Sequence, residues 1–167
     1  ARVDDTLRKV RCLSPGRRSP ERAGPRLLQR RASRRRHAQA VSARRLNWRA
    51  EGSGWIEQAR RLESPNFDQR PAGMAVDCLL IHYISLPPGV FSGDTIERLF
   101  LNRLEPTTDP RMAGLESLRV SAHFLIRRRG ELVQFVGTLD RAWHAGPSLL
   151  LHRERVNDFS IGVEIAH

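Results

Sequence analysis

The chain has 167 residues, which is enough for one domain with a buried core. Its formal net charge is +11, but residues 1–50 hold fifteen Arg and one Lys against three acidic residues, whereas residues 51–167 hold thirteen Arg against fifteen, so the two parts carry +13 and −2. The basic charge therefore gives no reason to expect that the second part binds a polyanion, and the absence of any run of 18 apolar residues argues against a membrane partner.

Residues 1–50 combine Arg, Pro, Ser and Gly without a sustained apolar period, and this composition predicts a disordered leader. A basic tail that binds nucleic acid or an acidic surface is one interpretation, and an extension without function is the other. Almost no aromatic residues alternate with the charges, so we do not expect nucleic acid as a partner. Cys12 lies in this leader and Cys78 in an apolar run, which predicts no disulfide and a reduced, cytoplasmic compartment.

The composition changes near Gly54, and we predict a domain over residues 54–167. Residues 64–71, with a proline near each end, are expected to form a loop. Residues 78–85 form a continuous apolar run, as in a strand covered on both faces. A helix is expected to follow, with Asp94 as its cap and closure at residues 107–110. Its apolar positions recur at helical spacing: Ile96, Leu99, Phe100 and Leu104.

The second half of the domain favours strands. Residues 120–126 and 131–136 are strand-like, and Arg129-Gly130 between them suits a hairpin turn. Residues 141–146 are expected to form a loop with a buried aromatic, and residues 159–165 a further strand. The order of these elements predicts a mixed α/β fold with a single compact domain.

Two residues stand out as candidates for chemistry. His82 lies inside the apolar run before a Pro-Pro turn, so it is either a core histidine bonded to backbone or a zinc ligand on a rigid element. Glu164 lies in the last predicted strand, and it either faces solvent or is buried with a raised pKa that suits a general base.

The other histidines of the domain are interpreted differently. His123 is expected to be structural, and His152 to be solvated. His144 follows Trp143 in a loop, where recognition and packing are both open. No His-x-x-x-His or Cys-x-x-Cys pair exists, so any metal site has to be assembled from distant segments.

Several motifs together closely resemble one enzyme family. In chain order they are ESPNFDQRP, LLIHYISLPPGVFSG, LRVSAHFLIRRRGELVQFV, RAWHAG and RERVNDFSIGVE. From about Gly54 to Glu164 the chain resembles the cytoplasmic 1,6-anhydro-N-acetylmuramoyl-L-alanine amidases of the AmpD type. These enzymes belong to the type-2 amidase family, which includes bacteriophage amidases and peptidoglycan recognition proteins.

The resemblance implies a central mixed β-sheet flanked by helices and one catalytic Zn²⁺. It implies hydrolysis of the amide between (1,6-anhydro-)N-acetylmuramic acid and L-alanine in muropeptides during cell-wall recycling. By position, His82 matches a zinc ligand and Glu164 the glutamate that activates water. Arg119 and Arg155 match basic positions near the muropeptide, and Trp143 resembles a residue of the groove wall. A monomer is expected.

The chain also departs from the family pattern. Tyr83 stands where the family often has asparagine, and Ile165-Ala166-His167 follow Glu164 where the family has a leucine, an acidic residue and a glycine. The resemblance places the second and third zinc ligands, a histidine and an aspartate, beyond residue 167, so the chain is expected to be a fragment. The alternative function is a catalytically inactive, truncated peptidoglycan-binding remnant.

Overall fold

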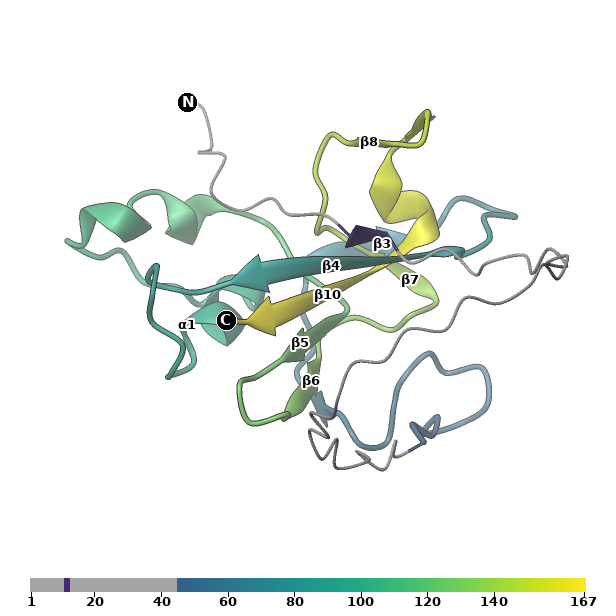
Figure 1. Cartoon of the computed structure of the whole chain (residues 1–167), viewed down its shortest axis with the longest axis horizontal. Helices are drawn as coiled ribbons and strands as arrows, with labels where there is room; N and C mark the ends of the chain where they lie inside the picture. The colour runs from purple at the N-terminus through teal and green to yellow at the C-terminus, as the bar shows by residue number, and fades with distance from the viewer. Residues whose placement is uncertain (1–10, 13–44) are drawn as a thin grey trace, which may run out of the picture. The chain divides into compact units, whose positions relative to one another are not determined.

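The computed structural model describes residues 11–12 and 45–167 (Figure 1). Most of the predicted leader, residues 1–50, therefore lies outside the described residues. The compact unit contains Leu46–His167, and its first residues form a small turn in which Trp48 bridges Ile56. Within that turn the Arg49 amide donates to the Trp55 carbonyl oxygen at 2.8 Å.

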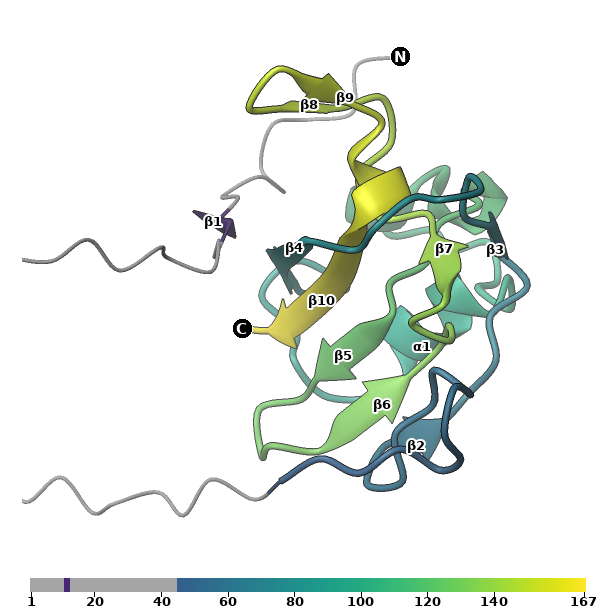
Figure 2. The same ribbon diagram turned by 90° about the vertical axis from the view of Figure 1, so that its right-hand side faces the viewer.

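Six strands form the main sheet, in the order β1-β4-β10-β5-β6-β2 (Figure 2). The strand β10 runs parallel to both of its neighbours, β5 and β6 are antiparallel, β2 is parallel to β6, and β1 is antiparallel to β4. The predicted mixed central sheet is thus confirmed. The strand bounds are β1 Arg11–Cys12, β2 Arg60–Arg61, β4 Cys78–Ile84, β5 Phe124–Ile126, β6 Leu132–Gln134 and β10 Ser160–Ala166.

The two long strands are those that the sequence predicts most clearly. Strand β4 coincides with the apolar run, and β10 begins one residue later than expected. The prediction that β4 is covered on both faces holds for one face only. Cys78, Leu80 and Ile84 are buried, whereas on the opposite face Leu79 and Ile81 are half-buried and Tyr83 is 47% exposed.

The helix α1 (Thr95–Phe100) is shorter than predicted. Asp94 occupies the N-cap position, but its side chain makes no capping hydrogen bond, because its backbone (φ −117°, ψ 14°) is not extended as in a capping residue. Asn102 adopts a positive φ of 56° and ends the helical path, so Leu104 lies outside the helix and still packs on the core.

Two predicted loops contain a small sheet of their own. Strand β3 (Phe67–Gln69) pairs antiparallel with β7 (Asp140–Ala142). Strand β3 lies within the region 64–71, and β7 overlaps the start of the region 141–146. The loop predictions are therefore wrong in part, because three-residue strands give too little alternation to detect. The remaining short elements are the hairpin β8 (Leu149–Leu150) and β9 (Arg153–Glu154) and the 3₁₀ helices η2 (Pro110–Met112), η3 (Leu115–Ser117) and η4 (Val156–Phe159).

The predicted hairpin of residues 120–136 is present with shorter strands. Gly130 has φ +82°, which a glycine adopts without steric cost, and the Arg127 amide donates to the Glu131 carbonyl oxygen across the turn. Before β5 the backbone forms hydrogen bonds to other segments. The Ser121 amide donates to the Trp143 carbonyl oxygen, and the His123 amide donates to the Gly162 carbonyl oxygen. These bonds fix the course of the chain toward the candidate site.

The main core lies where α1 packs on one face of the sheet. From the strands it includes Ile84, Leu125 and Ala166, and from α1 it includes Ile96, Leu99 and Phe100. The ring of Phe100 meets that of Phe135 edge to face, with the centroids 5.1 Å apart. In the described part of the chain no helix is long and apolar enough to cross a bilayer.

Candidate active site

His82 and Glu164 lie side by side on the two central parallel strands. Their Cα atoms are paired in the register of β4 and β10, so both side chains lie on the same face of the sheet. Leu125 of β5 is paired with Glu164 on the other side and belongs to the main core. The sheet thus brings together two residues that are 82 positions apart in the sequence.

The Glu164 carboxyl group is buried, with only 9% of the residue exposed. Its Oε2 atom has no hydrogen-bond partner among residues 11–12 and 45–167. Burial disfavours the charged form and raises the pKa of Glu164 to about 8. Of the two interpretations of this residue, the structure agrees with the buried carboxyl group and not with one that faces solvent, and a group with such a pKa can exchange a proton near neutral pH.

A second histidine, His144, contacts His82. The His82 Nε2 and His144 Nδ1 atoms are 3.2 Å apart, and the two rings meet at 71°. The other nitrogen of His144, Nε2, lies 3.2 Å from the hydroxyl of Ser160. Burial, followed by the neighbouring His123 and His82, lowers the pKa of His144 well below its ordinary value, so its ring is neutral. Packing is therefore the interpretation of His144 that the structure supports.

Gly162 makes room for the His144 ring. A Cβ atom on Gly162 would lie 2.3 Å from the His144 Cγ atom, much closer than any normal contact. Gly162 stands between Ser160 and Glu164 on the same face of β10, because alternate residues of a strand share a face. Only glycine at this position allows the ring to lie against the strand.

His123 is structural, as predicted. The residue is fully buried, its Nδ1 accepts the Gly162 amide at 3.0 Å, and its Nε2 lies 3.1 Å from the Asp140 carbonyl oxygen. Burial lowers the pKa of His123 to about 4, so the ring is neutral. His152 is exposed, as expected for a solvated side chain.

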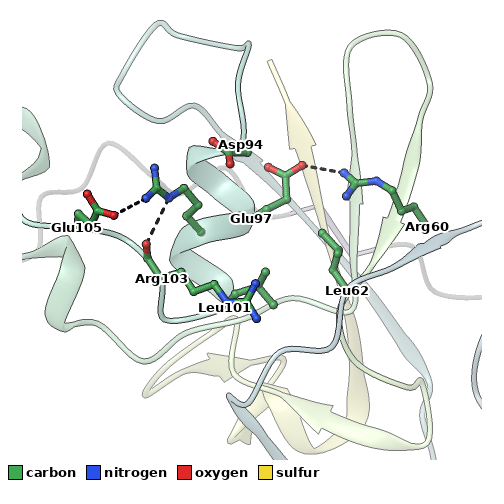
Figure 3. A pocket seen from close by; sticks show the side chains of 8 residues that line it. Arg60, Leu62, Asp94, Glu97, Leu101, Arg103 and Glu105 are labelled. Atoms are coloured by element: carbon green, nitrogen blue, oxygen red, sulfur yellow. Dashed lines mark hydrogen bonds and ion pairs between the residues drawn. The ribbon is translucent and has the colours of Figure 1, made fainter.

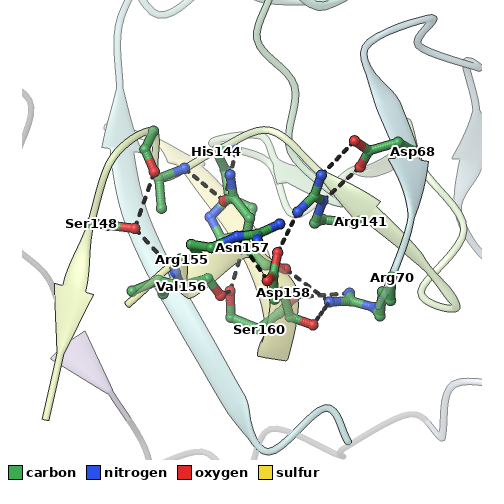
Figure 4. Close-up of polar contacts among 12 residues, drawn as sticks. Asp68, Arg70, Arg141, His144, Ser148, Arg155, Val156, Asn157, Asp158 and Ser160 are labelled. Carbon is green, nitrogen blue, oxygen red and sulfur yellow. Dashed lines mark hydrogen bonds and ion pairs between the residues drawn. The ribbon is translucent and has the colours of Figure 1, made fainter. Parts of the chain in front are cut away.

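The segment that carries Arg155 is linked to the His144 loop (Figure 4). The Asn157 Oδ1 atom accepts the backbone amides of His144 and Ala145 at 3.2 and 2.9 Å. Arg155 has φ +57°, is exposed, and its Nε atom lies 3.1 Å from Asp158 Oδ2. Arg155 is thus presented to solvent on the loop side of the site.

A network of charged residues supports this segment. Arg141 donates two hydrogen bonds to Asp68, at 2.6 and 2.5 Å, and a third to Asp158 (Figure 4). The Arg141 hydrogen bond, and in second place one from Trp143, lower the pKa of Asp68. Trp143 is half-buried beside this network and next to His144 in the chain.

Arg119 and Tyr83, the remaining residues singled out in the sequence, have other partners. Arg119 is exposed, and its guanidinium donates to the carbonyl oxygens of Glu116 and Leu118 rather than to a group near the histidines. Tyr83 lies on the opposite face of β4 from His82, and the His167 ring packs against it with the centroids 6.1 Å apart. His167 therefore does not substitute for a ligand beside His82.

The roles of Ser160, Gly162 and His144 could not be recognised from their positions in the sequence alone. The one signal was FSIGVE, in which alternation places Ser160 and Gly162 on the same face as Glu164, and a glycine inside a strand indicates a close approach of another group. Which side chain approaches depends on the loop that carries His144, and that loop has no periodic pattern.

A pocket of about 570 Å³ lies elsewhere, along α1 (Figure 3). Two ion pairs lie within its lining, Glu97 with Arg60 and Arg98 with Glu105, and Glu97 also pairs with Arg127 outside the lining. It contains none of the predicted site residues. The lining residues are Arg60, Leu62, Asp94, Glu97, Arg98, Leu101, Arg103 and Glu105.

Zinc would require more ligands than this face supplies. Across residues 11–12 and 45–167 no group of three or more His, Cys, Asp or Glu side chains could hold a metal ion. His82 fits one imidazole ligand, and the buried Oε2 of Glu164 fits the carboxylate that acts on an attacking water. The described residues thus fit part of a catalytic zinc site.

Comparison with known proteins finds amidases of similar sequence. The 1,6-anhydro-N-acetylmuramyl-L-alanine amidase AmpD of Citrobacter freundii is 53% identical over 112 residues, which cover 67% of this chain and 60% of that protein. The Escherichia coli K12 protein of the same name is 52% identical, with 61% of its length covered. The chain thus spans about 60% of the length of these curated relatives.

The fold and the sequence family agree as well. A crystal structure of a selenomethionine AmpD derivative superposes with a TM-score of 0.65 at 52% identity, covering 68% of this chain and 63% of that one. The family model described as N-acetylmuramoyl-L-alanine amidase matches residues 72–167, which include β4, β10 and both residues of the pair. The chain therefore belongs to the N-acetylmuramoyl-L-alanine amidase family Amidase_2.

Proposed function

We propose that this chain carries part of the active site of a zinc-dependent N-acetylmuramoyl-L-alanine amidase. The substrate is a muropeptide, and the bond cut is the amide between (1,6-anhydro-)N-acetylmuramic acid and L-alanine, during cell-wall recycling in the cytoplasm. The observation that carries the proposal is the in-register pairing of His82 with the buried Glu164. The names of the relatives support the choice of substrate.

In the proposed reaction His82 is one ligand of the zinc. Zinc, when bound, polarises the amide carbonyl and lowers the pKa of water. Glu164 accepts a proton from the attacking water and delivers it to the departing amine of L-alanine. In the metal-free protein its apolar surroundings, with Leu125 on one side, raise its pKa to about 8. A carboxyl group that is not held permanently charged can both accept and return the proton.

Substrate binding is proposed for the loop side of the site. Arg155 presents an exposed guanidinium, a planar fork that suits the carboxylates of the stem peptide. Trp143 precedes His144 in the chain and is hydrogen-bonded to Asp68, and we propose that it forms an aromatic wall of the groove. Arg119 is a more distant basic group, and we propose that it contacts the far end of the muropeptide.

The test uses this chain fused after His167 to the remaining C-terminal segment of the Escherichia coli relative. We expect zinc in stoichiometric amount and release of an L-alanine-terminated peptide from anhydromuramyl-tripeptide. Glu164→Gln should retain zinc and lose most of the turnover, by about 10²-fold or more, because the proton acceptor is removed while the shape is kept. Full turnover in Glu164→Gln would remove this residue from the mechanism.

A second function is a domain that binds peptidoglycan fragments without cutting them. It is favoured by the absence of a three-residue metal cluster among the residues that the structure describes. Calorimetry with anhydromuramyl-tripeptide separates the two functions: in the fused protein, binding with no peptide release at saturating zinc would support the binding domain and contradict the amidase.

A further inference from the structure

We propose that His144 and Ser160 are positioning residues that fix the tautomer of His82, with the proton on Nε2 and the lone pair on Nδ1. The inference deepens the proposed function, since it rests on the role of His82 as a metal ligand and names the nitrogen that it offers. Three hydrogen bonds in series carry the argument, and their direction is set at one end by a backbone carbonyl.

The series begins at Ser160, which is fully buried in β10. Its hydroxyl lies 2.6 Å from the Val156 carbonyl oxygen, and a carbonyl oxygen can only accept. The single hydrogen of the hydroxyl is therefore used in this bond. Toward His144, whose Nε2 lies 3.2 Å away, the Ser160 oxygen can then only accept.

The next step is the ring of His144. Because Ser160 accepts, the proton of the neutral His144 ring is on Nε2, and Nδ1 carries the lone pair. The Nδ1 atom lies 3.2 Å from His82 Nε2, so His82 has to be the donor in this third bond. A neutral His82 that donates from Nε2 carries its lone pair on Nδ1, and a metal binds only a nitrogen with a lone pair.

Packing keeps the series in place. The His144 ring lies against the backbone at Gly162, where a Cβ atom would approach Cγ to 2.3 Å. The His123 and His82 rings contact it edge to face, at centroid distances of 5.8 and 5.3 Å. The packed ring cannot turn over, so the direction of its hydrogen bonds can change only if its proton moves from Nε2 to Nδ1. Ser160 opposes this move, because its oxygen accepts the proton on Nε2.

The experiment is nuclear magnetic resonance of the metal-free chain with ¹⁵N-labelled histidine. We expect a coupling across the N–H···N bond between His82 Nε2 and His144 Nδ1, with the proton covalently attached to His82. A proton attached to His144 Nδ1, or no coupling between the two rings, would overturn the proposal. The readout needs neither zinc nor substrate, so the coupling in this chain together with no amidase activity in the fused protein would contradict the proposed function alone.

A matched pair of variants tests the role of His144. In His144→Phe the ring remains over Gly162 but offers no acceptor, and we expect the slowly exchanging His82 Nε2–H signal to disappear and a population protonated on Nδ1 to appear. In His144→Asn the side-chain oxygen can accept in place of Nδ1, so the single His82 tautomer should return. A His82 tautomer that is unchanged in His144→Phe would show that His144 has no positioning role.

Ser160→Ala tests the start of the series and serves if the His144 variants do not fold. Without the serine acceptor, His144 can also carry its proton on Nδ1, and we expect both His144 tautomers and a partial reversal of the His82–His144 bond. One unchanged tautomer for both rings in Ser160→Ala would exclude Ser160 from the series. The amide spectrum of each variant reports whether the fold is retained.

Discussion

Glu164 is a carboxyl group in the interior of the sheet, between His82 on one strand and Leu125 on the other. Burial alone raises its pKa to about 8, whereas in the unfolded chain it titrates near 4.5. In the metal-free protein the neutral form is therefore favoured on folding, and the charged form is penalised. The same penalty would be relieved by a cation bound beside it.

This shift gives a signed pH dependence of stability. Below pH 4.5 Glu164 is protonated in both states, and its contribution to the free energy of unfolding is fully present. As the pH rises from 4.5 through 8, the unfolded state ionises first, and that contribution is lost. We expect Glu164→Gln to be more stable than the metal-free parent protein at pH 8, by a few kcal/mol at about 1.36 kcal/mol per pKa unit.

Urea unfolding of both proteins between pH 4.5 and 8 measures the difference. It should shrink toward zero as the pH falls, because glutamine resembles the protonated carboxyl group. A difference that does not change with pH would mean that Glu164 has the same pKa in the folded and unfolded states.

At the scale of the elements, Arg141 joins three segments. It connects β7, in which it lies, to Asp68 of β3 and to Asp158 of η4, just before β10. The Asp158 side chain is only 6% exposed, so loss of Arg141 leaves a buried carboxylate with Arg155 as its remaining partner. We expect Arg141→Ala to lower the free energy of unfolding by about 1–3 kcal/mol.

The control is Arg111→Ala, which removes an ion pair with Asp109 on the surface. That pair is solvated, so its loss should not change the stability measurably. Chemical denaturation measures the free energy of unfolding of both variants. An equal decrease in the two would show that the Asp68–Arg141–Asp158 network contributes no more to stability than a surface pair.

The long elements could be predicted from the sequence, and the short ones could not. Strands β4 and β10 have seven residues each with strong apolar character, and the Gly130 turn has a local signal. Strands β3 and β7 have three residues each, and the Asp68–Arg141 contact between them joins segments that are distant in the sequence. The early end of α1 follows from the backbone at Asn102, which no periodicity shows.

The candidate site could likewise be predicted from the sequence only in part. His82 and Glu164 could be singled out as polar residues inside apolar strands, and the resemblance to the amidases assigned their roles. Their adjacency depends on the parallel register of β4 with β10, which is a property of the folded sheet. The contribution of His144 could not be foreseen, because it depends on how a loop lies over Gly162.

At the scale of the whole molecule, we expect the polypeptide Ala1–His167 to bind zinc weakly. A catalytic zinc needs three protein ligands, and none of the described residues completes such a set around His82. Metal analysis after dialysis should give well below one equivalent of zinc. One tightly held equivalent would show that further ligands of this polypeptide reach the site.

The central position of β10 in the sheet determines when Glu164 comes to lie beside His82. This strand lies between β4 and β5, so until it docks, the strands on its two sides do not share a single hydrogen-bonded ladder. The docking that closes the sheet is also the event that sets Glu164 beside His82. A partly folded or locally opened chain would have neither a continuous sheet nor the His82–Glu164 pair, so the sheet and the proposed site would form and open together.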